Sequence, residues 1–154
     1  MPSSTCSTPD LDELLCFAVH STGFAFNRTY RRVLNQLNLT YPQYLVMLAL
    51  WREDGVTVGQ LGERLSLETN TLTPLLKRLE AMALLTRRRS TEDERRVLVA
   101  LSDAGRAMQQ DAKGISDCIA TDSGLPLADL QRLTRDLQTL RGNLERAAAE
   151  QGGS

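Results

Sequence analysis

The most informative run in this sequence is residues 57–101, TVGQLGERLSLETNTLTPLLKRLEAMALLTRRRSTEDERRVLVAL. It begins with a capping box, Thr57-Val-Gly-Gln60, which predicts a short helix that ends near Ser66. From Thr71, apolar residues recur at helical spacing and predict a second helix. These apolar residues are Leu72, Leu75, Leu76, Leu79 and Met82. Two short helices joined by a few residues resemble a helix-turn-helix.

A β-hairpin is predicted directly after the second helix. Residues 84–89 and 96–101 have the composition of strands, and the segment between them, 90–95, is polar and strongly charged. A hairpin that directly follows a helix-turn-helix is a wing. We therefore expect a winged helix-turn-helix over about residues 40–101, and this is the region that would bind DNA.

Helices are also predicted before the winged helix. Thr8-Pro9-Asp10 predicts the start of a long first helix that runs to about Leu37, with Thr8 as a possible cap and Pro9 in the first turn. Thr40-Tyr-Pro-Gln43 is another capping box, and the apolar run after it predicts a buried helix.

Further helices are predicted after the wing. Ser102 can cap a helix that runs to about Thr121, and Ser123-Gly-Leu-Pro126 separates it from a last helix through Ala149. The fold class is therefore mainly α with a small β-hairpin wing. We expect a single domain over residues 1–154, in which the helices at about 10–37 and 102–149 flank the winged helix.

These flanking helices carry more apolar surface than a domain of this size can easily cover alone. We therefore expect them to hold a homodimer together. A compact monomeric bundle is the alternative, but a winged helix with long flanking helices seldom closes on itself.

Composition excludes several classes of protein. Hydrophobic residues make up 42% of the 154 and charged residues 24%, which is ordinary for a globular chain. The longest apolar segment, 44–51, is far too short to span a bilayer, and the N-terminal segment has no signal-peptide pattern, so we expect a cytoplasmic protein that does not bind membranes. The net charge of -1 argues against a general nucleic-acid coat but allows a local basic patch.

Two groups of polar residues suit DNA. Thr71, Thr73, Lys77 and Arg78 point away from the apolar face of the second predicted helix, where they would meet base edges and phosphates in a major groove. The alternative is a solvated helix face. The predicted wing favours DNA contact over a solvated face, because arginines cluster there in a chain whose net charge is slightly negative. They are Arg87, Arg88, Arg89, Arg95 and Arg96.

Asp93 and Arg95 have a sharper interpretation at the wing tip. A carboxylate two residues away can orient the Arg95 guanidinium so that it projects into a narrow minor groove. We therefore expect the recognition helix to lie in the major groove and the wing arginine to enter the flanking minor groove.

The run LTPLLKRLE at 72–80, the wing RRSTEDER at 88–95 and the flanking helices resemble the MarR family of dimeric winged-helix regulators. The similarity covers about residues 11–147. Glu68-Thr69-Asn70 departs from the Asp-Ser-Gly that is usual in the subgroup named below, so operator preference is left open. The expected DNA-binding set is Thr69, Asn70, Thr71, Thr73, Lys77, Arg78, Arg88, Asp93 and Arg95.

Within that family, the run LCF at 15–17, Tyr30 and the run LTYPQY at 39–44 resemble the OhrR-type organic hydroperoxide regulators. The resemblance implies that Cys16 is the peroxide-reactive cysteine and that Tyr30 and Tyr41 hydrogen-bond its sulfur. It also implies that Cys118 resolves the oxidised cysteine as an intersubunit disulfide. A buried apolar role is the alternative for Cys118.

The implied function is a repressor. The reduced homodimer would occupy an inverted-repeat operator, and oxidation of Cys16 by an organic hydroperoxide would release the DNA. The alternative is a repressor of the same family that is released when a small aromatic ligand binds without covalent chemistry. A thiol peroxidase is a third candidate, but a thioredoxin-like pattern is absent from the sequence, so we do not expect an enzyme.

The residues themselves support a redox site. A thiolate attacks the O–O bond of a peroxide, and tyrosine hydroxyls can stabilise the sulfur anion by hydrogen bonding. Phe17 and Phe24 would suit an alkyl or lipid hydroperoxide, or they simply pack in a core or interface. Three cysteines, an odd number, argue against a structural disulfide framework.

Spacing predicts that the site is shared between subunits. Tyr30 follows Cys16 by fourteen residues, which places both on one helix face but about 21 Å apart. If two first helices cross antiparallel at Gly23, the midpoint, then Cys16 faces Tyr30 of the partner subunit. We expect such a composite site.

His20 and Cys6 have weaker interpretations. His20 stands one turn after Cys16, where a tyrosine is usual in the subgroup, and it is either a packing or surface residue or a hydrogen-bond donor to the thiolate. Its spacing to the cysteines matches no usual zinc pattern, so we expect neither a metal nor another cofactor. Cys6 is expected to be incidental.

Overall fold

The structure is a computed structural model that describes residues 8–152, so Cys6 lies outside the described residues. The described part of the chain forms two compact units, residues 8–113 and 114–152. That the two units act as one domain stays a prediction. The first unit contains two 3-10 turns, η1 (Leu11–Glu13) and η2 (Asn35–Leu37), and five helices and three strands. Those are α1 (Leu15–Leu34), α2 (Tyr41–Arg52), β1 (Val56–Thr57), α3 (Val58–Leu65), α4 (Thr69–Ala81), β2 (Leu85–Arg89), β3 (Val97–Leu101) and α5 (Asp103–Asp111).

The first helix begins later than predicted. Asp10, and not Thr8, caps the first turn, because its carboxylate accepts the backbone N–H of Asp12 and forms the short turn η1. Leu14 is then extended, with φ -80° and ψ 118°, and α1 begins at Leu15. The predicted end near Leu37 is confirmed, since the last turn continues as η2 and Asn38 then adopts a left-handed conformation.

Both predicted capping boxes are present. The Thr40 hydroxyl accepts the backbone N–H of Gln43 while the Gln43 side chain accepts the N–H of Thr40, and Thr57 and Gln60 exchange the same two bonds. The first box begins α2, which is the centre of the core. The second begins α3, which ends at the left-handed Ser66, so the helix-turn-helix is α3 and α4.

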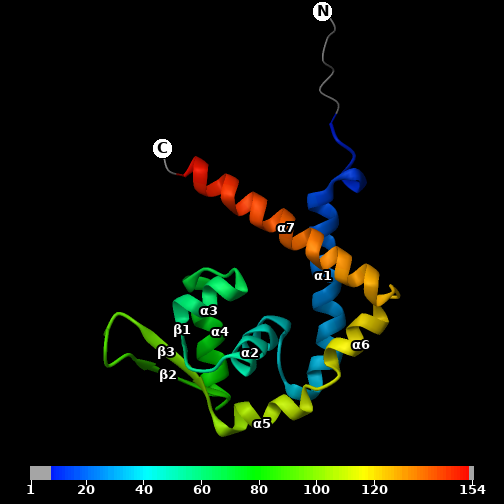
Figure 1. Cartoon of the computed structure of the whole chain (residues 1–154). Helices are drawn as coiled ribbons and strands as arrows, with labels where there is room; N and C mark the ends of the chain where they lie inside the picture. The colour runs from blue at the N-terminus through cyan, green and yellow to red at the C-terminus, as the bar shows by residue number, and fades with distance from the viewer. Residues whose placement is uncertain (1–7, 153–154) are drawn as a thin grey trace, which may run out of the picture. The chain divides into compact units, whose positions relative to one another are not determined.

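The predicted hairpin is confirmed. Strands β2 and β3 pair antiparallel, from Leu85 opposite Leu101 to Arg89 opposite Val97. In Figure 1 the hairpin projects from the body formed by α2, α3 and α4. Strand β1 was not predicted; its two residues pair with the other side of β3, so the sheet order is β1-β3-β2. Two residues are too few to show the alternation that identifies a strand.

Helix α5 is fixed to the winged helix by several contacts. Ser102 caps it as predicted, because its hydroxyl accepts the N–H of Gly105. The Trp51 indole N–H donates to the Gly105 carbonyl at 2.8 Å. Asp54 accepts the backbone N–H of Leu101 at 2.8 Å and forms an ion pair with Arg106 at 2.9 Å. The end of the wing, α2 and α5 therefore form one packed body.

The second unit contains α6 (Ile115–Asp122) and α7 (Leu127–Gln151). The prediction of one helix from Ser102 to about Thr121 is wrong, because α5 ends at Asp111 and Gly114 adopts φ 83°, a left-handed conformation that glycine tolerates and a helix does not. The predicted break before the last helix is confirmed. Across residues 8–152, none of the helices combines the length and apolar character that a membrane span needs.

Candidate DNA interface and cysteine site

Helix α4 has one apolar and one polar face. Leu72, Leu76 and Leu79 are fully buried, which leaves the polar residues of the helix on the opposite side. The exposed members of the expected DNA-binding set on this helix are Thr69, Asn70, Thr71, Lys77 and Arg78. Thr73 differs, because it is half-buried and its hydroxyl donates to the Thr69 carbonyl at 2.8 Å. Their contact with DNA stays a prediction.

The wing tip is an ordered turn built around two side chains. The Ser90 hydroxyl accepts backbone N–H groups from Glu92 and Asp93. Asp93 in turn accepts both the backbone N–H and the Nε–H of Arg95, at 3.1 and 3.2 Å. The hydrogen bonds from Arg95 lower the pKa of Asp93, so its carboxylate stays charged. The Arg95 side chain is still 91% exposed, and the turn therefore presents a held but solvent-facing guanidinium.

Arg96 and Arg88 extend this basic surface. The Nε of Arg96 lies 3.7 Å from the second carboxylate oxygen of Asp93, so one acidic residue holds two arginines. Arg88 is exposed on β2. Arg87 is different, since it is half-buried and paired with Glu80.

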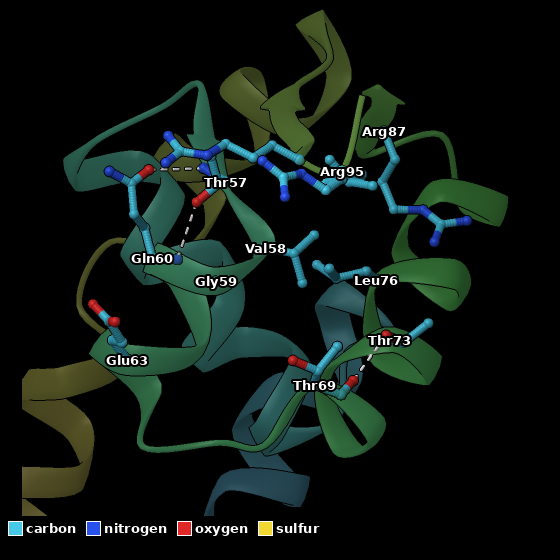
Figure 2. Close-up of a pocket in the computed structure, with 12 residues that line it drawn as sticks. Thr57, Val58, Gly59, Gln60, Glu63, Thr69, Thr73, Leu76, Arg87 and Arg95 are labelled. Carbon is cyan, nitrogen blue, oxygen red and sulfur yellow. Dashed lines mark hydrogen bonds between the residues drawn. The ribbon is translucent and has the colours of Figure 1, made fainter. Parts of the chain in front are cut away.

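A hollow of about 610 Å³ lies between α3, α4 and the wing (Figure 2). Hydroxyl, amide, carboxylate and guanidinium groups from β1, α3, α4 and the wing surround it. Its polar lining residues are Thr57, Gln60, Glu63, Thr69, Thr73, Arg87, Arg95 and Arg96. Thr57 and Gln60 were not predicted as lining residues, because they reach the hollow only through the packing of α3 beside the hairpin.

Cys16 is exposed at the second position of α1. Tyr30 lies in the same helix, so the two are separated by about 21 Å of helix, and Cys16 does not lie beside Tyr30 of its own chain. Gly23 lies between them, and a Cβ built there meets nothing within 4 Å. The geometry within one chain is thus compatible with the predicted crossing, which itself stays a prediction.

Tyr30 is the centre of an aromatic cluster. Its ring stacks on Tyr41 of α2 with centroids 4.3 Å apart, and it lies 5.7 Å from Tyr44 and 6.4 Å from Phe26. Tyr44 continues the cluster to Trp51, at 6.3 Å. Burial, together with the neighbouring Tyr41 and Tyr44, raises the pKa of Tyr30 to about 12. Burial also raises the pKa of Tyr41, so both hydroxyls keep their protons at neutral pH and can donate hydrogen bonds.

Two further candidate residues are His20 of α1 and Cys118 of α6. His20 is exposed and contacts the Phe24 ring edge-on at 4.7 Å. Cys118 is exposed on α6 in the single chain, and its role stays a prediction. Groups of three or more metal-binding side chains do not occur within residues 8–152.

Comparison with known proteins identifies the family. The family model of the transcriptional regulators SarA/Rot matches residues 28–112. The organic hydroperoxide resistance transcriptional regulator of Bacillus subtilis (strain 168) is 42% identical over 84% of this chain and 88% of its own. The regulator TtmR of Methylorubrum extorquens (strain PA1) is 44% identical over 90% of this chain and 71% of its own.

Solved structures agree with this. Reduced AbfR bound to DNA superposes with a TM-score of 0.71 and 35% identity over 84% of this chain and 90% of its own. Disulfide-formed AbfR superposes with a TM-score of 0.60 and 35% identity, over 82% of this chain and 88% of its own. The matched family consists of transcriptional regulators, which confirms that the chain is not an enzyme. The predicted resemblance to MarR-type, hydroperoxide-responsive regulators is confirmed as well, and the chain belongs to the SarA/Rot family of winged-helix transcriptional regulators.

Proposed function

We propose that this chain is a redox-sensing repressor in the cytoplasm. Its reduced homodimer binds an inverted-repeat operator and releases it when an organic hydroperoxide oxidises Cys16. The observation that carries the proposal is a stacked pair of protonated tyrosines: Tyr30, which shares a face of α1 with the exposed Cys16, and Tyr41 at the start of α2. A relative named as an organic hydroperoxide resistance regulator supports the choice of oxidant.

DNA binding is assigned to α4 and the wing. The exposed Lys77 and Arg78 would contact the major groove and its phosphates, and Arg95, held by Asp93, would enter the adjacent minor groove. A dimer would place two such elements on successive turns of one face of the duplex. The structure of reduced AbfR bound to DNA, at 35% identity, supports DNA binding by this chain.

Uncovered apolar side chains support the homodimer. On α1, Leu15, Val19 and Phe26 are exposed at spacings of four and seven residues, which is one helix face. On α7, Leu133, Leu137 and Leu144 repeat the same spacing and are also exposed. A stripe of this kind on each unit favours burial against a second copy.

The redox step needs the second copy for a separate reason. The thiolate of Cys16 attacks the peroxide O–O bond, so that sulfur takes one oxygen as a sulfenic acid and the alkoxide leaves as an alcohol after protonation. Because Tyr30 of the same chain is about 21 Å away, the hydrogen bonds to the sulfur would come from Tyr30 and Tyr41 of the partner subunit. These donors stabilise the thiolate that reacts.

Cys118 would complete the switch. Its thiolate attacks the sulfenic sulfur of the partner subunit's Cys16 and releases water, which leaves an intersubunit disulfide. A disulfide requires the two Cα atoms to lie within about 7 Å of each other. If they start farther apart, closing the bond moves the flanking helices and the DNA-reading elements attached to them. The disulfide-formed structure of AbfR, at 35% identity, supports a disulfide as the oxidised state.

The test is a non-reducing mass analysis after one equivalent of cumene hydroperoxide or hydrogen peroxide. Wild type, Cys16→Ser and Cys118→Ser are compared. A covalent dimer that forms preferentially with the organic oxidant, and only in wild type, is the expected result. If Cys16 stays reduced, the redox function is wrong, and release by a small aromatic ligand becomes the better explanation. In that case induction survives in Cys16→Ser.

A further inference from the structure

The geometry points to Glu80 and Arg87 as a positioning pair: we propose that they hold the wing at a fixed distance from the recognition helix α4 and thereby set the selectivity of DNA binding. Neither residue belongs to the expected DNA-contacting set. The inference rests on the proposed DNA binding by α4 and the wing, and it assigns a role to a half-buried wing arginine whose guanidinium is paired with a carboxylate.

The pair joins the end of α4 to the middle of β2. Glu80 occupies the last turn of the helix, and the chain then reverses through Ala83, whose φ is 59°. One carboxylate oxygen of Glu80 accepts the backbone N–H of Arg87 at 3.0 Å. The other accepts the Nε–H and Nη2–H of the same residue at 3.1 and 2.9 Å. Three hydrogen bonds to one residue fix both its backbone and its side chain.

The backbone bond has a particular value because β2 is an edge strand. The sheet order β1-β3-β2 leaves one side of β2 without a strand neighbour. An N–H on that side needs another partner, and the Glu80 carboxylate supplies it for Arg87. At this point the Glu80 side chain accepts the hydrogen bond that a neighbouring strand would otherwise accept. It therefore connects the wing directly to α4.

The pair also neutralises Arg87, which lines the same hollow as Arg95 and Arg96. The Arg87 side chain is only 24% exposed, and its guanidinium is engaged by the carboxylate. The hydrogen bonds from Arg87 lower the pKa of Glu80, so the pair stays ionised at neutral pH. Among the five arginines that the sequence groups together, Arg87 is thus a structural member.

The hollow explains why such a tie matters. The space between α4 and the wing is open rather than filled by side chains, and Thr73 lies on one side of it and Arg95 on another (Figure 2). Packing alone does not hold the two elements apart at this place. A helix in a major groove and a wing in the next minor groove must keep a fixed separation to contact the same duplex.

The Glu80→Gln variant separates two roles for the carboxylate, because a purely electrostatic role and a positioning role predict opposite changes in DNA affinity. A carboxylate near the DNA-binding surface repels phosphates, so its removal should strengthen binding if charge alone matters. If Glu80 positions the wing, the same change should weaken binding to a selected sequence. Glu94→Gln is the matched control, because Glu94 is an exposed carboxylate at the wing tip and the change in charge is identical.

The experiment uses a duplex selected by the wild-type protein from a pool of random duplexes, and an unselected duplex from the same pool. Glu80→Gln and Arg87→Gln should each bind the selected duplex about tenfold more weakly, the scale of losing one recognised base pair, while binding to the unselected duplex is kept. The double variant should be no worse than either single one, because the two residues act through each other.

Two results would overturn the inference. In the first, Glu80→Gln binds the selected duplex as well as, or better than, wild type, in parallel with Glu94→Gln. In the second, binding to both duplexes falls together with the melting temperature, which shows a general loss of stability. If the wild-type protein itself selects no sequence, the proposed function fails with the inference, and that failure is visible before any variant is made.

Discussion

The rings of Tyr30 and Tyr41 are stacked, with centroids 4.3 Å apart and an angle of 21° between their planes. One belongs to α1 and the other to α2, so the contact joins the helix that carries Cys16 to the helix at the centre of the core. Burial of the pair keeps both phenols protonated. Their hydroxyls can therefore act as donors and not as negative charges.

Tyr30→Phe should slow the oxidation of Cys16 by cumene hydroperoxide roughly tenfold or more, because a hydrogen bond to an ionised sulfur contributes about 1.5–3 kcal/mol. The ring and its stack on Tyr41 are kept, so binding of the reduced protein to DNA should not change. The rate is measured as loss of free thiol under excess oxidant. Tyr44→Phe is the control, since this buried tyrosine belongs to the same cluster but not to the proposed site. An unchanged rate in Tyr30→Phe would argue against the composite site.

Stability should fall at alkaline pH through Tyr30. The folded-state pKa of about 12 lies above the ordinary value of 10.0, so the folded state holds the proton more tightly than the unfolded state. The contribution to stability is complete below pH 10 and is lost as pH rises through about 12. Between pH 10 and about pH 12, the melting temperature should therefore fall less steeply with pH for Tyr30→Phe than for wild type. Parallel curves would show that Tyr30 does not carry this dependence.

Local patterns predicted the local structure. Each capping box forms from side chains and N–H groups within four residues, and both Thr40 and Thr57 cap their helices as expected. The first helix was misplaced because Thr8 and Asp10 are both good caps, and sequence alone does not rank them. The break at Gly114 was missed because apolar residues keep a helical spacing across it.

Tertiary contacts were the least predictable part. Arg87 counts as one of five wing arginines in the sequence, but its partner Glu80 lies across a turn and cancels its charge. Tyr30 and Tyr41 were expected from a resemblance, whereas the extension of their cluster through Tyr44 to Trp51 depends on how α1 and α2 pack. No local pattern encodes that packing.

Gly105→Ala should destabilise the protein, although alanine favours helices and Gly105 lies within α5. A Cβ at this position would lie 2.0 Å from the Leu84 carbonyl oxygen, which is backbone and cannot rotate away. We expect a loss of about 2 kcal/mol or more in the free energy of unfolding, measured by denaturant titration. Gly142→Ala is the matched control, because a Cβ there meets nothing within 4 Å. That change should stabilise α7 by about 0.5–1 kcal/mol, and equal effects at the two positions would contradict the close contact at Gly105.

Arg95→Ala should remove sequence preference at the edges of the operator more than at its centre. The Arg95 side chain is exposed and held by Asp93, which prepares it to enter a narrow minor groove, and such grooves are typical of A·T-rich DNA. Selection from random duplexes should therefore give A·T-rich flanks for wild type and no flank preference for Arg95→Ala, with the central half-sites unchanged. Lys77→Ala, on the exposed face of α4, should instead weaken binding to all sequences and reduce the slope of log affinity against log salt concentration by about one. The flanks that it selects should stay A·T-rich. If Arg95→Ala also lowers only the salt dependence and leaves the flanks unaltered, Arg95 acts as a phosphate contact and the minor-groove role is wrong.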